Sequence, residues 1–159
     1  MIRIFSQEEL DKIPEDYDKQ IQISFDRAII TKKYSFPIII SGAKDVEVQK
    51  RASVILVNGA SACLYNKAFA KVYDHCKIET WDKSAAIFYD DAEGEAHNFS
   101  TIILHDNSQC QAYDSVILKL YDNSRGKLFM SATGMAHDKT KIEAAENCLV
   151  TLYGLLMVS

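Results

Sequence analysis

The sequence predicts an all-β protein, a single-domain parallel β-helix (solenoid) with about 16 residues, or two octads, per turn and a small N-terminal β/α cap. Three observations lead to this fold class. The chain from Lys44 to Leu155 divides into fourteen consecutive eight-residue repeats without an insertion. Within the repeats apolar positions alternate with other residues, which is typical of strands and not of helices. The outward positions of odd-numbered and even-numbered repeats differ in charge, so two repeats make one turn of the coil.

Length and composition restrict the class of protein. A chain of 159 residues with 48% hydrophobic residues is sufficient for one globular domain. The net charge of −4 offers no basic surface, so we expect no direct nucleic-acid binding. No apolar run approaches the roughly 20 residues of a membrane helix, and the N-terminus lacks the basic start of a signal peptide. We therefore expect a soluble cytoplasmic protein without membrane contact, in which the four cysteines, lacking a CxxC pair, are reduced.

The first part of the chain differs from the repeats. We expect residues 1–35 to form the N-terminal cap and residues 36–159 to form the octapeptide-repeat solenoid. Ser6 and Glu9 have the spacing of a capping box, which predicts a brief helix after an initial strand. Residues 20–25 alternate with period two and predict a further strand. This segment would cover the open end of the coil, where strand edges would otherwise stay unpaired.

Each position of the repeat has its own residue preference. Positions three and five are free of charge in all fourteen repeats, so we expect both to point inward. Position one is mostly small, position six usually carries an aromatic or imidazole ring, and position seven is Asp or Asn in ten repeats. Asp and Asn side chains can bond their own backbone two residues on, so we expect a turn there and stacked rings beside it. Residues 140–150 have some helix propensity, but they keep the frame and are expected to form strands.

Positions two and four point outward, and their charge separates two faces. In the odd repeats ten of these fourteen residues are charged, whereas in the even repeats only Lys71 and Lys119 are. Sorting the repeats by threes removes this contrast, which favours two repeats per turn over three. The odd face is then a solvated surface. The even face is a flat apolar surface on the order of 500–600 Å², above the few hundred Å² that monomers usually expose.

The even face is therefore the predicted binding site, and the expected function is protein binding without catalysis. Its cover is left open among three occupants: a second copy related by a two-fold axis, giving a homodimer, another protein such as a host partner, and the N-terminal segment folded back. The predicted binding-face residues are Ile55, Phe69, Lys71, Tyr73, Ile87, Tyr89, Ile103, Ile117, Lys119, Tyr121 and Met135.

No arrangement of side chains predicts catalysis. Successive turns would place Asp90 and Asp106 about 4.8 Å apart, and their repulsion needs relief from turn N–H groups or from a cation such as calcium. We expect the turn N–H groups to supply it. His105 and His137 lie two turns apart with Tyr121 between them, too far to share one metal ion. Without a Ser–His–Asp or Cys–His pairing or a glycine-rich phosphate loop, we expect no enzyme activity, no cofactor and no metal site.

Several repeats share the pattern A-x-V-x-A-Y-D-N, namely residues 68–75 (AFAKVYDH), 108–115 (SQCQAYDS) and 116–123 (VILKLYDN), and they follow a leader, EELDKIPED, at Glu8–Asp16. Together they resemble uncharacterised octapeptide-repeat proteins encoded by bacterial phages and mobile elements. The resemblance covers nearly the whole chain and implies a solenoid, but it transfers no catalytic residue. Its implied origin suggests an inhibitor of a host defence system, of the anti-CRISPR or anti-restriction type. The competing hypothesis is a structural scaffold that assembles end to end through apolar residues 155–158.

Overall fold

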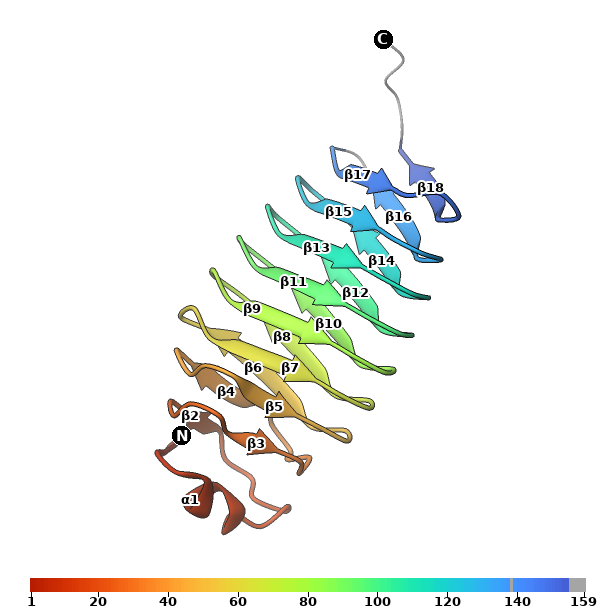
Figure 1. Cartoon of the computed structure of the whole chain (residues 1–159). Coiled ribbons are helices and arrows are strands. Elements are labelled where there is room, and N and C mark those ends of the chain that lie inside the picture. Colours follow the sequence, from red (N-terminus) through yellow and green to blue (C-terminus); the bar gives the residue numbers. More distant parts are fainter. Residues whose placement is uncertain (138, 155–159) are drawn as a thin grey trace.

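Two parallel β-sheets wound as one coil form the protein, and the computed structural model describes residues 1–137 and 139–154. Figure 1 shows the strands stacked along the coil, with one short helix at the N-terminal end. A ten-stranded sheet, called sheet A here, contains β1 (Ile2–Ile4), β2 (Ile21–Ile23), β4 (Ile38–Ser41), β6 (Ser53–Val57), β8 (Phe69–Val72), β10 (Ala85–Phe88), β12 (Thr101–Leu104), β14 (Ile117–Leu120), β16 (Thr133–His137) and β18 (Leu149–Tyr153). An eight-stranded sheet, called sheet B, contains β3 (Ile29–Ile30), β5 (Val46–Val48), β7 (Ser61–Leu64), β9 (Lys77–Thr80), β11 (Glu93–Ala96), β13 (Gln109–Ala112), β15 (Arg125–Leu128) and β17 (Lys141–Ala144). The all-β parallel solenoid predicted from the sequence is confirmed, with roughly 16 residues per turn and about 9 turns.

The register between neighbouring strands explains the eight-residue repeat. From β4 onward each strand pairs with the strand two octads further along the chain, so that Ala85 lies opposite Thr101. The first turns are longer than two octads, as their register shows: Ile2 lies opposite Ile21, Gln22 opposite Ile39, and Ile29 opposite Glu47. The segment 1–35, for which the sequence predicts a cap, therefore contributes three strands to the two sheets although it does not follow the octad frame.

Inward residues at positions three and five fill a thin core between the sheets. Val54, Leu56 and Phe88 are fully buried there. Gly94 leaves room for the ring of Phe88, because a Cβ at this glycine would lie 2.6 Å from the ring atom Cζ and 2.6 Å from the carbonyl oxygen of Ile78. Small and large side chains therefore face one another across the core, as dense packing of a thin interior requires.

The turns at position seven differ in mechanism from the prediction. These residues adopt the left-handed region, with φ between 55 and 60° from Lys50 to Met130, a conformation that Asp and Asn tolerate better than most residues. We expected their side chains to bond their own backbone two residues on. The Asp and Asn side chains from Asn66 to Asp122 instead accept the N–H of the equivalent residue one rung earlier, where a rung is one 16-residue turn of the coil. For example, the N–H of Asp90 donates to Asp106 Oδ2 at 3.0 Å. The N–H groups of neighbouring turns thus relieve the repulsion within the column of carboxylates.

The N-terminal helix closes one end of the coil. Helix α1 (Gln7–Asp11) begins at Ser6, whose Oγ accepts the N–H of Glu9, while the Glu9 carboxylate accepts the N–H of Phe5. The side-chain amide of Gln7 donates to the Ile29 carbonyl at 3.0 Å and accepts the Ile29 N–H at 2.8 Å. These two hydrogen bonds pair backbone groups at the free edge of β3. The helix therefore covers a strand edge, as a cap should, and not the outer face of sheet A.

The last described repeats stay in the frame. Residues 140–150 contain β17 and the start of β18, so the prediction of strands there is confirmed. Leu149 is 64% exposed and Leu152 is 57% exposed, because β18 is the last described strand of sheet A. Residues 155–158, on which the hypothesis of an end-to-end scaffold rests, lie outside the described residues.

Candidate binding faces of the solenoid

The outer face of sheet A consists of two aligned rows of side chains. The register of two octads per turn places position four of each even repeat in one row: Ile39, Ile55, Lys71, Ile87, Ile103, Lys119, Met135 and Thr151. It places position two in a second row: Ser53, Phe69, Ala85, Thr101, Ile117, Thr133 and Leu149. All eight predicted position-two and position-four residues therefore come together on one face. Ile39 extends this face by one rung, and the octad frame, which begins at residue 36, contained the signal for it.

The side chains of this face are only partly covered. Ile55, Phe69, Ile87, Ile103 and Met135 are half-buried, and Ile117 is 39% exposed. Neither lysine of the face makes an ion pair with any residue in the described part of the chain. The face is thus a largely apolar strip along the coil, interrupted by the two cationic side chains, Ser53 and a few threonines.

A stack of rings forms one margin of the apolar strip. Tyr73, Tyr89, His105, Tyr121, His137 and Tyr153 follow one another with centroid distances of 4.5–5.4 Å and interplanar angles of 8–13°. The three predicted tyrosines of the binding face all lie in this stack, and burial, followed by the charge of Tyr89, raises the pKa of Tyr73. Because each inner ring is covered on both faces, only ring edges and hydroxyl groups remain for a partner.

The two histidines of this stack do not form a metal site. Tyr121 lies between them, at 5.1 Å from His105 and 4.5 Å from His137 between centroids. His105 Nδ1 instead lies 3.2 Å from Asp122 Oδ2. Within residues 1–137 and 139–154, no group of three or more His, Cys, Asp and Glu residues could hold a metal ion.

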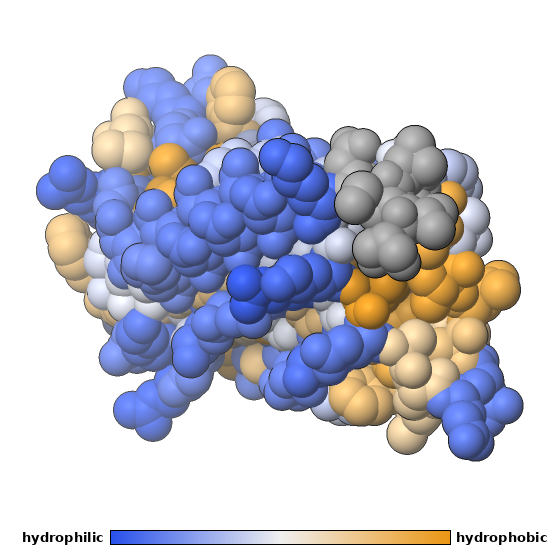
Figure 2. All heavy atoms as spheres, turned by 90° about the horizontal axis from the view of Figure 1, so that it is seen from above, coloured by the Kyte–Doolittle hydropathy of each residue, from blue (hydrophilic) through white to orange (hydrophobic). Residues whose placement is uncertain are grey.

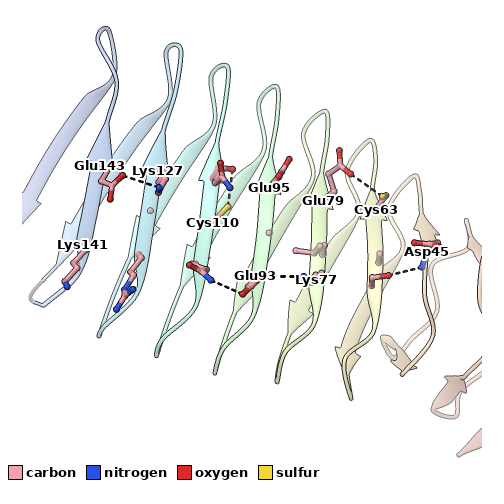
Figure 3. Close-up of a pocket in the computed structure, with 18 residues that line it drawn as sticks. Asp45, Cys63, Lys77, Glu79, Glu93, Glu95, Cys110, Lys127, Lys141 and Glu143 are labelled. Carbon is pink, nitrogen blue, oxygen red and sulfur yellow. Dashed lines mark hydrogen bonds and ion pairs between the residues drawn. The ribbon is translucent and has the colours of Figure 1, made fainter.

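A groove of about 820 Å³ runs along the outer face of sheet B, a feature that the sequence analysis missed. Positions two and four form its two walls, and the backbone of position three, including Gly94 and Gly126, forms its floor. Figure 3 shows the walls, with Lys77, Glu93 and Lys141 in one row and Glu79, Glu95, Lys127 and Glu143 in the other. The sequence indicated only a charged, solvated face, because a channel between two rows depends on side-chain height and sheet curvature.

Charge is unevenly distributed along this groove. The half nearer the N-terminus is lined by four carboxylates, of Asp45, Glu79, Glu93 and Glu95, and one lysine, whereas the other half is lined by Arg125, Lys127, Lys141 and one carboxylate. Two ion pairs cross between rungs, Lys77 with Glu93 at 3.7 Å and Lys127 with Glu143 at 3.4 Å. The groove therefore has an acidic end and a basic end, separated by the uncharged pair Gln109 and Gln111.

The surroundings of the thiols beside this groove disfavour the thiolate form. Burial raises the pKa of the Cys63 thiol, and the neighbouring carboxylate of Glu79 raises it further. Burial also raises the pKa of Cys110, in the floor of the groove. The ring of His97 is stacked between Trp81 and Tyr113, with centroid distances of 4.0 and 5.0 Å. Its Nε2 lies 3.8 Å from a carboxylate oxygen of Glu79 and 3.8 Å from one of Glu95, both in a wall of the groove. Activation of a thiol requires a group, such as a neighbouring cation, that lowers its pKa. Among the described residues, no cationic group lowers the pKa of Cys63 or Cys110.

The two faces give the molecule an amphipathic surface. Figure 2, which shows the molecule from above the view of Figure 1, has a broad hydrophilic region beside a region in which most of the apolar residues in view are gathered. No described helix is long and apolar enough to cross a membrane. No family model, no curated protein and no solved structure matches the chain, so these comparisons add no relative to the β-solenoid fold.

Proposed function

We propose that the protein is a non-enzymatic binding module that self-associates through the outer face of sheet A. The observation that supports this proposal is the alignment of Ile39, Ile55, Ile87, Ile103 and Met135 in one row, reinforced by Phe69 and Ile117 in the next. Each of these side chains retains exposed apolar surface in the single chain. Contact with a second apolar surface would remove that area from water, which is the main driving force of association.

The size of the face is sufficient for a pair of copies. A strip on the order of 500–600 Å² on each copy would bury a total on the order of 1,000 Å², which is the lower limit for a specific interface. Two flat sheets pack face to face with their backbones about 10 Å apart, so the outward isoleucines of two copies would interdigitate. The N-terminal segment, which the sequence left open as a cover, lies at the end of the coil and leaves this area available.

A two-fold axis along β12 accommodates the two lysines. This axis would bring β8 of one copy over β16 of the second and β14 over β10, because each pair lies equally far from β12 in sheet A. Lys71 would then face Met135, and Lys119 would face Ile87, so that no two ammonium groups meet. Both lysine stems would cover apolar surface while their head groups reach water at the margin.

Sedimentation equilibrium at about 0.5 M salt tests this proposal, because surface charge contacts are weak at a Debye length of about 4 Å. We expect a dimer for the wild type. Replacing Ile87→Lys and Ile103→Lys together would place four ammonium groups in the interface and is expected to give a monomer. The matched control, Asn107→Lys with Asn123→Lys, adds the same charge at exposed turn positions and should stay dimeric. A wild type that is monomeric at every concentration would overturn the proposal.

The other two functions suggested by the sequence, an inhibitor of host defence and an end-to-end scaffold, stay predictions. Neither has an observation among the described residues that favours it over pairing through sheet A.

A further inference from the structure

Three neighbouring strands of sheet B carry a charge pattern that is complementary to itself. Strand β11 presents Glu93 and Glu95, β13 presents Gln109 and Gln111, and β15 presents Arg125 and Lys127, at matching positions in the two walls of the groove. The order along the coil is therefore two acids, two amides and two bases. A pattern of this kind pairs with a reversed copy of itself, because the acids of one copy then meet the bases of the other.

We infer that the groove face of sheet B is a second self-association surface, on which two copies pair with their coils antiparallel and with β13 on the two-fold axis. This axis brings β11 of one copy over β15 of the second. Glu93 then faces Arg125, Glu95 faces Lys127, and each glutamine faces its own counterpart. The inference concerns the face opposite to sheet A and does not depend on the function proposed above.

Charge excludes the alternative orientation of the two coils. If the coils ran parallel, each rung would face the same rung of the second copy. The acidic rung of β11 would then meet a second acidic rung, and the basic rung of β15 would meet a second basic rung. Like charges directly opposite one another disfavour such a pair, so the pattern selects the antiparallel one.

The central charged groups are available for these contacts. Arg125 is exposed and makes no ion pair with any described residue, and the one ion-pair partner of Glu95 within the described residues is His97, at 3.8 Å. Each carboxylate oxygen of Glu93 already has one contact, Oε1 with the amide of Gln109 at 2.9 Å and Oε2 with Lys77 at 3.7 Å, but the side chain is 45% exposed and can accept further hydrogen bonds. An unpaired guanidinium facing a carboxylate can form two parallel hydrogen bonds with it, which gives orientation as well as attraction.

The same geometry limits the strength of the contact. The overlap extends from β9 to β17, about five rungs of 4.8 Å by a strand of about 13 Å, or roughly 300 Å² of sheet on each copy. In the outermost rungs Lys77 would face Lys141 and Glu79 would face Glu143, which are like charges. We therefore expect a weak contact that forms at low salt and disappears as the Debye length falls from about 10 Å at 0.1 M to about 3 Å at 1 M.

The two self-association faces lie on opposite sides of the coil. A copy that uses both would be joined to one neighbour through the apolar face of sheet A and to another through the groove face of sheet B. The expected product at low salt is a stack in which apolar and charged junctions alternate. At high salt only the apolar pairs would remain, so salt separates the two contacts experimentally.

Cysteine cross-linking tests the position of the axis. The full chain is used with Cys63→Ser, so that no half-buried thiol remains in the groove wall, and with Ile87→Lys and Ile103→Lys, so that contact through sheet A is removed. A cysteine introduced as Gln111→Cys would lie on the axis and face its own counterpart across sheets packed about 10 Å apart, which is beyond disulfide range but within the span of a short bismaleimide cross-linker. The control, Glu47→Cys, lies in the same row on β5 and has no counterpart in the antiparallel pair.

We expect the Gln111→Cys protein to form the bismaleimide-linked dimer about tenfold faster than the control at low salt, and to lose this advantage at 1 M salt. Equal cross-linking of the two proteins at low salt would overturn the inference. If the wild type is a dimer in sedimentation but Gln111→Cys shows no preferred cross-link, the proposed function stands and the groove contact is excluded. If the wild type is a monomer at high salt but the cross-link forms at low salt, only the groove contact stands.

Charge reversal provides the second test. Glu93→Arg with Glu95→Lys makes the pattern entirely basic, and Arg125→Glu with Lys127→Glu makes it entirely acidic. Each double variant alone is expected to lose the cross-link through residue 111, whereas an equimolar mixture of the two should regain it as a mixed dimer. Circular dichroism of each variant checks that the coil still forms. Unchanged cross-linking in both separate variants would exclude the proposed charge pairing.

Discussion

Replacing Gly94 by alanine is expected to lower the free energy of unfolding by about 2–3 kcal/mol, the upper part of the range for overpacking a core. The new Cβ would lie 2.6 Å from the Ile78 carbonyl oxygen and 2.6 Å from Phe88 Cζ. The carbonyl belongs to β9, the strand that pairs with β11, so it cannot withdraw without disturbing the sheet. The ring is fully buried and has no free space to enter.

Gly126→Ala is the matched comparison, because this glycine occupies the same position two rungs further along. Its Cβ would lie 2.6 Å from Leu118 Cδ2 and 3.0 Å from Leu120 Cδ2, which are ends of side chains that can rotate. We expect a smaller loss, about 1 kcal/mol. Combining Gly94→Ala with Phe88→Leu should recover about 0.5–1 kcal/mol relative to additivity, since the shorter side chain relieves one of the two clashes.

Urea denaturation followed by far-ultraviolet circular dichroism measures these differences, and an unchanged m-value would show that the same surface is exposed on unfolding. A loss for Gly94→Ala that does not exceed the loss for Gly126→Ala would refute the reasoning. It would show that the backbone of β9 moves freely and that the thin core is not closely packed at this rung.

Three further predictions concern the turns, a thiol and the cap. Asp82→Ala should lower the free energy of unfolding by about 1–2 kcal/mol in urea denaturation, because the N–H of the turn one rung earlier loses its acceptor at 2.8 Å and alanine tolerates positive φ poorly, whereas Asp82→Asn should lose less. Burial and then Glu79 raise the pKa of Cys63, so at pH 8 less thiolate is present than in a free thiol; alkylation should accelerate as pH rises and be faster in Glu79→Gln at the same pH. An alkylation rate unaffected by Glu79→Gln would exclude the role of this carboxylate. Gln7→Ala should cost about 1–3 kcal/mol and speed hydrogen exchange at the Ile29 amide, which donates to the Gln7 side chain at 2.8 Å; unchanged exchange there would contradict the role of the amide as an edge cap.

The two faces of the coil would respond to different conditions. Contact through sheet A removes apolar area from water and is expected to persist at high salt. Contact through the groove of sheet B depends on facing charges and is expected to weaken with salt. One chain could thus form pairs or longer stacks according to ionic strength, with the Lys71 and Lys119 positions and the Gln109 and Gln111 positions marking the two interfaces.

The sequence by itself determined the coil and which strand residues of the repeats point inward or outward. An alternation of period two decides which residues point inward, and a strict period of two octads decides which ones stack on neighbouring rungs, as with Tyr121 between His105 and His137. Both are local or periodic properties, so a single sequence contains them. The apolar row of Ile87 and Ile103 could be predicted for the same reason.

Tertiary structure alone decided the features that depend on distances across rungs and across the two sheets. The strands of segment 1–35 joined the sheets at separations longer than two octads and different from one another, which no fixed period reveals. The Asp106 carboxylate accepts the N–H of Asp90 in the previous turn and not an N–H of its own turn. The octad pattern does not contain the distance between stacked turns, which makes this hydrogen bond possible. The groove on sheet B, and the pairing of Gly94 with the Phe88 ring, arise from side-chain height and from packing between sheets, which follow from three-dimensional contact and not from order along the chain.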